Sequence, residues 1–265
     1  MRPASTPSQI DLPATRDRCK VELLGIIGGS GLTRLKTLEV AREQTVTTPY
    51  GQPSAPLTFG QFDGSPVVFL PRHGAEHTIP PHRVNYRANL WAMKHAGVER
   101  VVGMAAVGGI TTPMAPGVIC VPDQIIDYTW GREHTLYEED LCSVIHVDFT
   151  DPYCELLRRE LIRAAGAAGV DVHDGGTYAA TQGPRLESSA EIVRLERDGC
   201  DIVGMTGMPE ASLARELGLC YACLALSVNW AAGKSDGPII MAEIEGHLEH
   251  GMGEARKILA EIART

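Results

Sequence analysis

Short apolar runs alternate with longer amphipathic stretches along most of the chain, and this alternation limits the folds that it can adopt. The apolar runs lack polar alternation, which is typical of strands buried on both faces. Strands are predicted at residues 23–28, 66–71, 100–106, 117–123, 175–181, 201–206 and 220–228. Helices are predicted at residues 84–97, 153–169, 188–199, 209–218 and 242–263. The order predicts an α/β fold, a single domain with a mixed central β-sheet flanked by helices.

Capping signals mark where some of these helices begin or end. Ser188, followed three residues later by Glu191, forms a capping-box pattern at a helix start. Pro209 suits the first turn of the next helix, because a missing N–H costs nothing there. Gly199 and Gly218 stand where helices are predicted to stop. These signals agree with the boundaries that the apolar periodicity predicts.

Length and composition indicate one soluble domain with a substantial core: the chain has 265 residues, 44% hydrophobic and 22% charged. No run of about 18 apolar residues occurs, so no membrane-spanning helix is predicted. The first twenty residues are polar, contain prolines and lack the apolar segment of a signal peptide. We therefore predict a disordered leader at residues 1–20 and one folded domain at residues 21–265.

Charge and cysteine content narrow the class of protein. The formal net charge of -9 disfavours a nucleic-acid partner, since binding would need a basic surface. Cys220 and Cys223 lie together in an apolar run that is typical of a buried strand. No second pair completes a zinc site, so we interpret them as small buried apolar residues, with a redox or metal role as the alternative. The odd cysteine count without a secretory signal predicts a cytoplasmic location.

A glycine-rich turn and a basic pair follow the first two predicted strands. The Gly-Gly-Ser-Gly turn around Ser30 either directs backbone N–H groups and a hydroxyl at an anion or is a tight turn only. Arg72 and His73 end the second strand, and both side chains suit phosphate oxygens. His73, His77 and His82 could suggest a metal, but two consecutive prolines break any helix that would align them. We therefore predict no metal.

Other strand ends carry residues that either face a ligand or form turns. Residues 105–109 and 204–207 have small side chains, which let a backbone approach a ligand closely. Glu187 precedes a predicted helix, where its carboxylate either lies in solvent or accepts hydrogen bonds in a cleft. Asn229 ends a buried strand, as a turn former or as a group that reads a ligand. Open α/β sheets bind ligands at such strand ends, which makes these positions candidates.

Eight motifs in a fixed order resemble the family of trimeric purine nucleoside phosphorylases and methylthioadenosine phosphorylases. They are GGSGL, PRHG, NYRANLWAMK, AVGGI, PGVICVPDQIIDYT, TQGPRLES, DIVGMTGMPEASLARELG and CYACLALSVN. The resemblance covers roughly residues 22–260. It implies a homotrimer that cleaves a purine from a ribose with inorganic phosphate as co-substrate, and it implies no metal or organic cofactor.

The resemblance also implies a phosphate site and two catalytic residues. The implied phosphate ligands are Ser30, Arg72, His73, Ala105, Ala106 and Thr206. The family commonly has serine or threonine at the position of Ala105, so phosphate binding there would rely on the backbone. Asn229 and His73 are the implied catalytic residues, and Met205 would lie against the ribose.

The base pocket separates the members of this family. Glu187 can accept a hydrogen bond from N1–H of a 6-oxopurine, and Asn229 can donate to N7 or O6. Adenine-cleaving members have aspartates at the positions of Asn229 and Ala231, and a serine at that of Glu187. A carboxylate facing adenine N1 would set acceptor against acceptor, which can cost a factor of about 10⁴. The resemblance therefore favours a hypoxanthine-type base.

The residues implied at the 5′ end of the sugar favour a methylthio group over a hydroxyl. Inosine-cleaving members place a histidine near the start of the last long helix, where this chain has Met241 and Ala242. His146 resembles the position that reaches a neighbouring subunit's 5′ site in the methylthio members. Together these features resemble the subgroup that cleaves S-methyl-5′-thioinosine to hypoxanthine and 5-methylthioribose 1-phosphate.

Other functions stay open on the sequence. One is a general purine nucleoside phosphorylase acting on inosine and guanosine, and another is a methylthioadenosine phosphorylase, which the base-pocket residues disfavour. From a different class, the chain could be a non-catalytic purine-binding protein, against which Arg72, His73 and Asn229 argue. A dinucleotide-binding oxidoreductase fits poorly, because the glycine-rich turn lacks the third glycine of that fingerprint.

Overall fold

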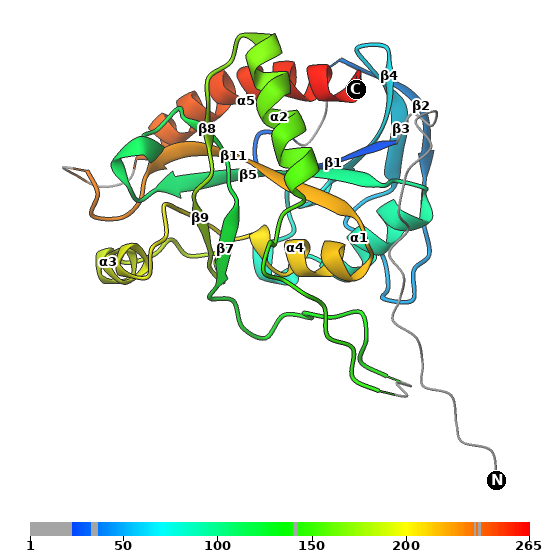
Figure 1. Ribbon diagram of the computed structural model, residues 1–265, viewed down its shortest axis with the longest axis horizontal. Helices are drawn as coiled ribbons and strands as arrows, with labels where there is room; N and C mark the ends of the chain where they lie inside the picture. Colours follow the sequence, from blue (N-terminus) through cyan, green and yellow to red (C-terminus); the bar gives the residue numbers. More distant parts are fainter. Residues whose placement is uncertain (1–22, 33–36, 140–142, 236, 238–239) are drawn as a thin grey trace.

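A mixed β-sheet runs through the centre of the protein, and helices cover both of its faces (Figure 1). The computed structural model describes residues 23–32, 37–139, 143–235, 237 and 240–265. The strands in these ranges are β1 (Leu24–Gly28), β2 (Leu38–Gln44), β3 (Leu57–Phe62), β4 (Ser65–Pro71), β5 (Arg100–Gly109), β6 (Ile119–Val121), β7 (Gln124–Asp127), β8 (Val172–Asp174), β9 (Thr177–Ala180), β10 (Ile202–Gly204) and β11 (Cys220–Trp230). The sheet order is β2-β3-β4-β1-β5-β10-β9-β7, and β11 pairs with β5 and β6, while β6 pairs with β8. The predicted α/β fold with a mixed sheet is confirmed.

The helices form a layer on each side of the sheet. They are the 3₁₀ helices η1 (Pro81–Arg83) and η2 (Thr112–Met114) and the α-helices α1 (Tyr86–His95), α2 (Glu155–Ala168), α3 (Ser189–Arg197), α4 (Gly207–Glu216) and α5 (Met241–Ala263). Helices α2 and α5 pack together on one face, and α1 and α4 pack on the other (Figure 1). All five predicted α-helices are confirmed, with ends that differ by a few residues.

The predicted strands are also confirmed, and the structure adds four that the apolar pattern does not mark. Strands β2, β3, β7 and β8 were not expected. Strand β2 is almost entirely exposed and pairs only with β3 at the edge of the sheet. A strand that buries neither face carries no apolar run, so its pairing comes from backbone hydrogen bonds and from β3 beside it.

The predicted signals at Ser188, Gly199 and Gly218 have the expected geometry. The Ser188 side chain accepts from the backbone N–H of Glu191, and the Glu191 carboxylate accepts from the backbone N–H of Ser188. Gly199 and Gly218 follow α3 and α4 with φ of 90° and 61°, in the left-handed region that glycine tolerates best. Pro209 lies in a kinked first turn of α4. Local sequence therefore determines these boundaries.

One edge of β5 has no partner among the described strands along the middle of the strand. β11 pairs in parallel with the whole of β5. On the other edge of β5, β1 pairs in parallel with residues 100–103 and β10 pairs antiparallel with Gly108 and Gly109. Among the described strands, residues 104–107 therefore have no partner on this edge. Their backbone N–H and C=O groups on this edge are therefore not used in pairing between the described strands.

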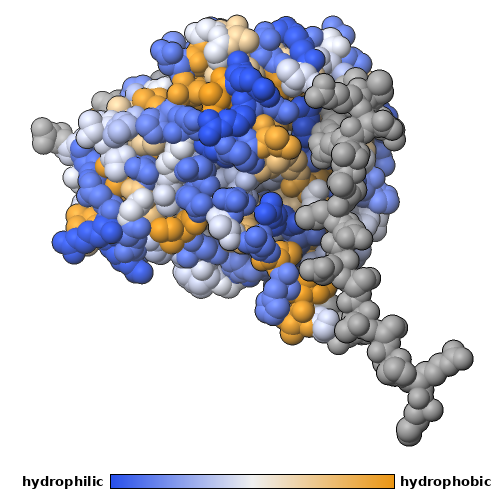
Figure 2. Space-filling model, viewed as in Figure 1, coloured by the Kyte–Doolittle hydropathy of each residue, from blue (hydrophilic) through white to orange (hydrophobic). Residues whose placement is uncertain are grey.

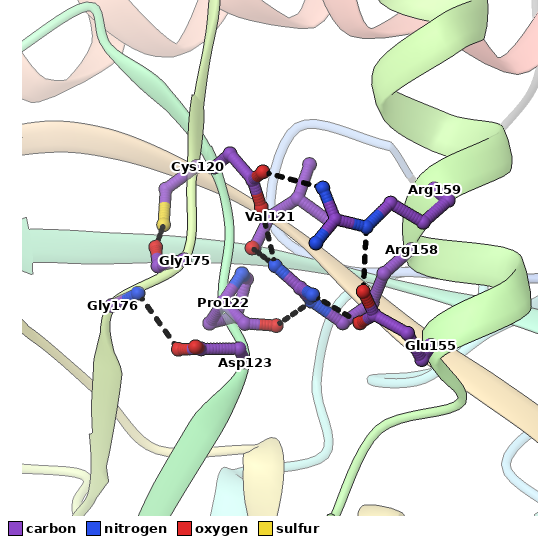
Figure 3. A network of polar contacts seen from close by, with 10 residues as sticks. Cys120, Val121, Pro122, Asp123, Glu155, Arg158, Arg159, Gly175 and Gly176 are labelled. Carbon is purple, nitrogen blue, oxygen red and sulfur yellow. Dashed lines mark hydrogen bonds and ion pairs between the residues drawn. The ribbon is translucent and has the colours of Figure 1, made fainter.

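A buried arginine on α2, away from this opening, ties the helix to the sheet (Figure 3). Arg158 donates to the backbone carbonyls of Val121 and Pro122 at 3.1 and 2.9 Å. It also forms ion pairs with Asp174 and Glu155. A buried guanidinium needs such partners to offset its lost hydration. Arg72 is a second buried arginine that is paired with a carboxylate.

The structure corrects the interpretation of Cys220. Cys220 forms a disulfide with Cys154, 66 residues away, so it is not a free thiol. The disulfide joins the residue before α2 to the first residue of β11. Cys223 is free and buried, in agreement with the interpretation as a small core residue.

The predicted leader, residues 1–20, lies outside the described residues. None of the described helices combines the length and apolar character needed to cross a membrane. Hydrophilic residues cover most of the face seen in Figure 2, and the hydrophobic residues form small separate areas.

Candidate active site

A cavity of about 530 Å³ is formed by the ends of β1, β4, β5, β10 and β11 and by the loops that follow them. This volume is within the range of cavities that bind small molecules. All six predicted phosphate ligands line the cavity, as do several predicted base and sugar contacts. The predicted residues that line it are Ser30, Arg72, His73, Ala105, Ala106, Glu187, Met205, Thr206, Asn229 and Ala231. The fold thus brings together residues that lie up to 201 positions apart in the sequence.

Arg72 is held at the cavity by a carboxylate that the sequence did not single out. Its guanidinium is 1% exposed and donates from Nε and Nη2 to the two carboxylate oxygens of Glu210, at 2.7 and 2.6 Å. Burial alone would lower the pKa of Arg72, but the charge and hydrogen bonds of Glu210 more than offset this and raise it. Arg72 is therefore a permanent cation in a fixed orientation.

The open middle of β5 lies beside this guanidinium. Arg72 Nη1 donates to the backbone carbonyl of Met104 at 2.7 Å. Backbone groups two residues apart in a strand face the same edge, so the N–H of Ala106 faces the opening too. A Cβ at Gly29 would lie 2.6 Å from the Met104 oxygen, so only glycine fits against this strand. Backbone donors are thus available where Ala105 offers no hydroxyl.

His73 presents a single ring nitrogen to the cavity. Its Nδ1 lies 2.8 Å from the carbonyl oxygen of Ile79, and since a carbonyl only accepts, Nδ1 carries the hydrogen. Burial, and then the adjacent charge of Arg72, lower the pKa of His73 to about 4. The ring is therefore neutral near pH 7. Its centroid lies 4.7 Å from that of His77, and the described residues contain no group of three side chains suited to a metal.

The lowered pKa of His73 predicts an acid-sensitive fold. Between its ordinary value of 6.5 and about 4, the unfolded chain binds a proton at His73 that the folded chain does not. Stability from this residue is present above pH 6.5 and is lost as the pH falls toward 4. His73→Gln should remove about 2 kcal/mol of the stability difference between pH 7 and about pH 5. Urea unfolding of both proteins measures this, with His173→Gln as a control outside the cavity; parallel pH profiles for wild type and His73→Gln would contradict it.

Glu187 lies in the cavity wall with its carboxylate oriented by a hydroxyl. Thr181 Oγ1 donates to Glu187 Oε1 at 2.6 Å. Thr181 directly follows β9, and sequence reasoning did not identify it as part of the site. One oxygen of the carboxylate is thereby fixed, and the other is an acceptor for a ligand. The alternative in which Glu187 lies in solvent beside the helix start does not fit this contact.

A β-bulge directs Asn229 into the cavity. The pairing of β11 with β5 shifts register between Ser227 and Asn229. Val228 and Asn229 both line the cavity, although successive residues of a regular strand face opposite sides. Bulges re-aim side chains in this way and are common beside active sites. Asn229 Nδ2 donates to the carbonyl of Trp230 at 2.7 Å, and since the amide nitrogen carries two hydrogens, one remains for a ligand.

Arg132 fixes the wall formed by Met205, and this residue too was missed. Its guanidinium is 9% exposed and donates to the backbone carbonyls of Met205 at 2.9 Å and Gln182 at 2.8 Å. A Cβ at Gly183 would lie 2.4 Å from the Met205 sulfur, so glycine makes room for the methionine. One cation thus joins the loops after β9 and β10, which form two sides of the cavity.

The last helix contributes a residue that was not predicted. Ala242 is exposed and does not line the cavity, whereas Ile244, two residues further along α5, does. The side chain of Met241 lies outside the described residues. His146 is exposed and does not line the cavity of its own chain. Among the described side chains of α5, Ile244 is the apolar residue that lines the cavity.

Comparison with known proteins gives a consistent result. The sequence profile described as the phosphorylase superfamily matches residues 23–264. A probable S-methyl-5′-thioinosine phosphorylase of Pseudomonas syringae is 56% identical over 89% of this chain and 96% of its own. A probable 6-oxopurine nucleoside phosphorylase of Dictyoglomus turgidum is 45% identical over 90% of each chain. The structure of a methylthioadenosine phosphorylase from Schistosoma mansoni with adenine superposes with a TM-score of 0.88 at 34% identity, covering 92% of this chain and 91% of that one.

The chain therefore belongs to the phosphorylase superfamily. Its relatives are nucleoside phosphorylases, which transfer a pentosyl group, and this protein is an enzyme of that type.

Proposed function

We propose that the enzyme catalyses phosphorolysis of S-methyl-5′-thioinosine to hypoxanthine and 5-methylthioribose 1-phosphate, a reaction of purine salvage. The observation that carries this proposal is a single cavity that is lined by Arg72 and His73, by Glu187 and Asn229, and by the apolar side chain of Ile244. The Pseudomonas syringae relative, whose name states this activity, supports it. The proposal requires inorganic phosphate as co-substrate and neither a metal nor an organic cofactor.

In this proposal, phosphate is bound by donors from β5 and from the segments that follow β1, β4 and β10. Arg72 supplies the cation, Ser30 and Thr206 supply hydroxyls, and the Ala106 N–H supplies a backbone donor. Neutral His73 carries no hydrogen on Nε2, so this nitrogen accepts from the hydroxyl of hydrogenphosphate. Because His73 is neutral, Arg72 is the only cationic side chain among these ligands. The dianion is therefore not held too tightly, and the product phosphate ester can leave.

The base is read by two groups with opposite hydrogen-bonding roles. The Glu187 carboxylate accepts from N1–H of hypoxanthine, and the Asn229 amide donates to N7 or O6. Ala231 lines the cavity where adenine-cleaving members carry an aspartate. Adenine offers an acceptor at N1, so the carboxylate disfavours it.

In the reaction, a phosphate oxygen forms a bond to C1′ as the bond from C1′ to N9 of the purine breaks. The electron pair of that bond moves onto the purine, and the ribose passes through an oxocarbenium-like state. The purine then takes up the proton that hydrogenphosphate loses, which gives hypoxanthine and the phosphate ester. Positioning by Arg72, His73 and Thr206 makes the attack effectively unimolecular. Asn229 stabilises the charge that develops on the purine, as a preorganised donor should.

Ile244 sets the preference at the 5′ end of the sugar. An isoleucine cannot hydrogen-bond a 5′-hydroxyl but packs well against a methylthio group. Ile244→Ser should therefore lower the ratio of kcat/KM for S-methyl-5′-thioinosine over inosine by roughly tenfold. Steady-state assays with both nucleosides measure the ratio, and Ala242→Ser, on the exposed side of α5, is the matched control. An unchanged ratio in Ile244→Ser would show that another residue sets the preference.

The proposed reaction is tested by incubating the protein with S-methyl-5′-thioinosine in the presence and absence of phosphate. We expect hypoxanthine and 5-methylthioribose 1-phosphate in equal amounts with phosphate, and no hypoxanthine without it. Release of hypoxanthine without phosphate would indicate a hydrolase, and absence of release would support a non-catalytic purine-binding protein.

A general 6-oxopurine nucleoside phosphorylase acting on inosine and guanosine is the second candidate. The readout by Glu187 and Asn229 fits inosine equally well, and the Dictyoglomus turgidum relative carries that name. The two candidates differ at the 5′ end of the sugar, where Ile244 favours the first.

We also propose a homotrimer in which His146 reaches the 5′ site of a neighbouring copy. His146 lies in an exposed segment with three exposed apolar neighbours, Val144, Ile145 and Val147. Such a segment is typical of a surface that another chain covers. The mass in solution by light scattering tests the trimer. A cytoplasmic location is likewise proposed, and cell fractionation followed by immunodetection of the protein tests it, with recovery outside the cytoplasmic fraction as the contrary result.

A further inference from the structure

The carboxylate of Glu210 holds the guanidinium of Arg72. Glu210 lies in α4, is 1% exposed and binds Arg72 through both oxygens. Bidentate pairing of this kind fixes the plane of a guanidinium as well as its position. Of the residues that line the described cavity, Arg72 is the only lysine or arginine. The orientation of the cation at the phosphate site therefore depends on Glu210.

Glu210 is itself held in place from a third element. The hydroxyl of Tyr221, in β11, donates to Glu210 Oε1 at 2.8 Å. A Cβ at Gly103, in β5, would lie 2.3 Å from the Tyr221 hydroxyl and 2.7 Å from Glu210 Oε1. The glycine thus leaves the space in which the tyrosine and the carboxylate meet. β5, α4 and β11 together support Arg72, which directly follows β4.

We propose that Glu210, oriented by Tyr221, is the positioning residue of the phosphate site. It holds the Arg72 guanidinium so that Nη1 meets the open edge of β5 and a hydrogen of Nη2 remains for the anion. Glu210 touches neither phosphate nor nucleoside and acts through Arg72 alone. This role rests on the proposed phosphorolysis, because it assumes that phosphate binds beside Arg72.

Binding of inorganic phosphate by calorimetry and steady-state kinetics of wild type and Glu210→Gln test this role. The glutamine keeps the shape of the side chain, but its NH₂ group faces one N–H of Arg72, so the guanidinium turns away. The dissociation constant of phosphate should rise by about tenfold or more, the loss of one charge-assisted hydrogen bond. The KM for nucleoside at saturating phosphate should stay within about twofold, since the base and 5′ walls are untouched. Equal changes in both constants would mean a general structural role and would overturn the proposal.

Tyr221→Phe provides a second variant that keeps the buried ion pair and should fold even where Glu210→Gln does not. It should raise the phosphate dissociation constant less than Glu210→Gln does. In a Glu210→Gln background it should add nothing, because the hydroxyl acts through the carboxylate. Unchanged phosphate binding in Tyr221→Phe would contradict the role of the tyrosine and of the support as a whole.

Glu155→Gln is the matched control, because it removes a carboxylate from the buried Arg158 outside the cavity (Figure 3). Phosphate binding should be unchanged in this variant, and a rise equal to that of Glu210→Gln would overturn the proposal. The binding measurement needs no turnover. Wild type that binds phosphate but cleaves no nucleoside would contradict the proposed function and leave the positioning role intact. Wild type that binds no phosphate would overturn both.

Discussion

Replacing Asn229 with alanine should lower kcat for S-methyl-5′-thioinosine by about 10²–10³-fold and raise KM. The amide donates to the purine where negative charge develops as the glycosidic bond breaks, so its bond is stronger in the transition state than in the ground state. The bulge in β11 aims this side chain, and the carbonyl of Trp230 fixes its rotation. Alanine removes the donor without filling the space.

Steady-state kinetics at saturating phosphate separate the two constants for Asn229→Ala. Gln124→Ala removes an exposed amide outside the cavity and should leave kcat unchanged. A rise in KM with kcat unchanged would mean that Asn229 binds substrate and transition state equally, and would contradict its catalytic role.

Replacing Glu187 with alanine should lower kcat/KM for S-methyl-5′-thioinosine by about 10²-fold, because the charged acceptor for N1–H is lost. The kcat/KM for methylthioadenosine should not fall, so the preference for hypoxanthine over adenine should become smaller. The contact from Thr181 at 2.6 Å fixes the carboxylate. Thr181→Val should therefore lower kcat/KM for S-methyl-5′-thioinosine less than Glu187→Ala does. It should affect the hypoxanthine substrate and not the adenine substrate, as Glu187→Ala does.

Parallel assays of both nucleosides with each variant check this prediction. Equal losses for the two bases in Glu187→Ala would show that the carboxylate supports the fold of the pocket and does not read the base.

Much of the fold follows from the sequence because burial and backbone geometry leave local signals. Strands β1, β5 and β11 are apolar on both faces, and α3 has a complete capping box. Strand β2 could not be found in this way, because it is exposed and depends on its neighbour. The disulfide from Cys154 to Cys220 also leaves no local signal, since it joins residues 66 positions apart.

The residues of the candidate site likewise divide into those that the sequence indicates and those that it does not. Strand ends and motifs located Arg72, His73, Glu187 and Asn229, and the structure places all four in one cavity. Glu210 lies inside a helix and meets its partner across 138 residues, so neither spacing nor periodicity indicates it.

Ile244 was missed because the face that α5 presents to the cavity depends on how the helix packs. The predicted residue, Ala242, lies near the same end of the helix but is exposed. Asn229 was identified by its place at a strand end, whereas the bulge that directs its side chain is a property of pairing with β5. Long-range packing and strand register are therefore the parts that the sequence does not reveal.

The central claim is that one cavity selects both a 6-oxopurine base and a methylthio group on the sugar. Its most direct test is kcat/KM with saturating phosphate for S-methyl-5′-thioinosine, inosine and methylthioadenosine, measured side by side. The kcat/KM for S-methyl-5′-thioinosine should exceed that for inosine by about tenfold or more and that for methylthioadenosine by about 10⁴-fold. A higher value for methylthioadenosine than for S-methyl-5′-thioinosine would contradict the hydrogen-bonding roles assigned to Glu187 and Asn229.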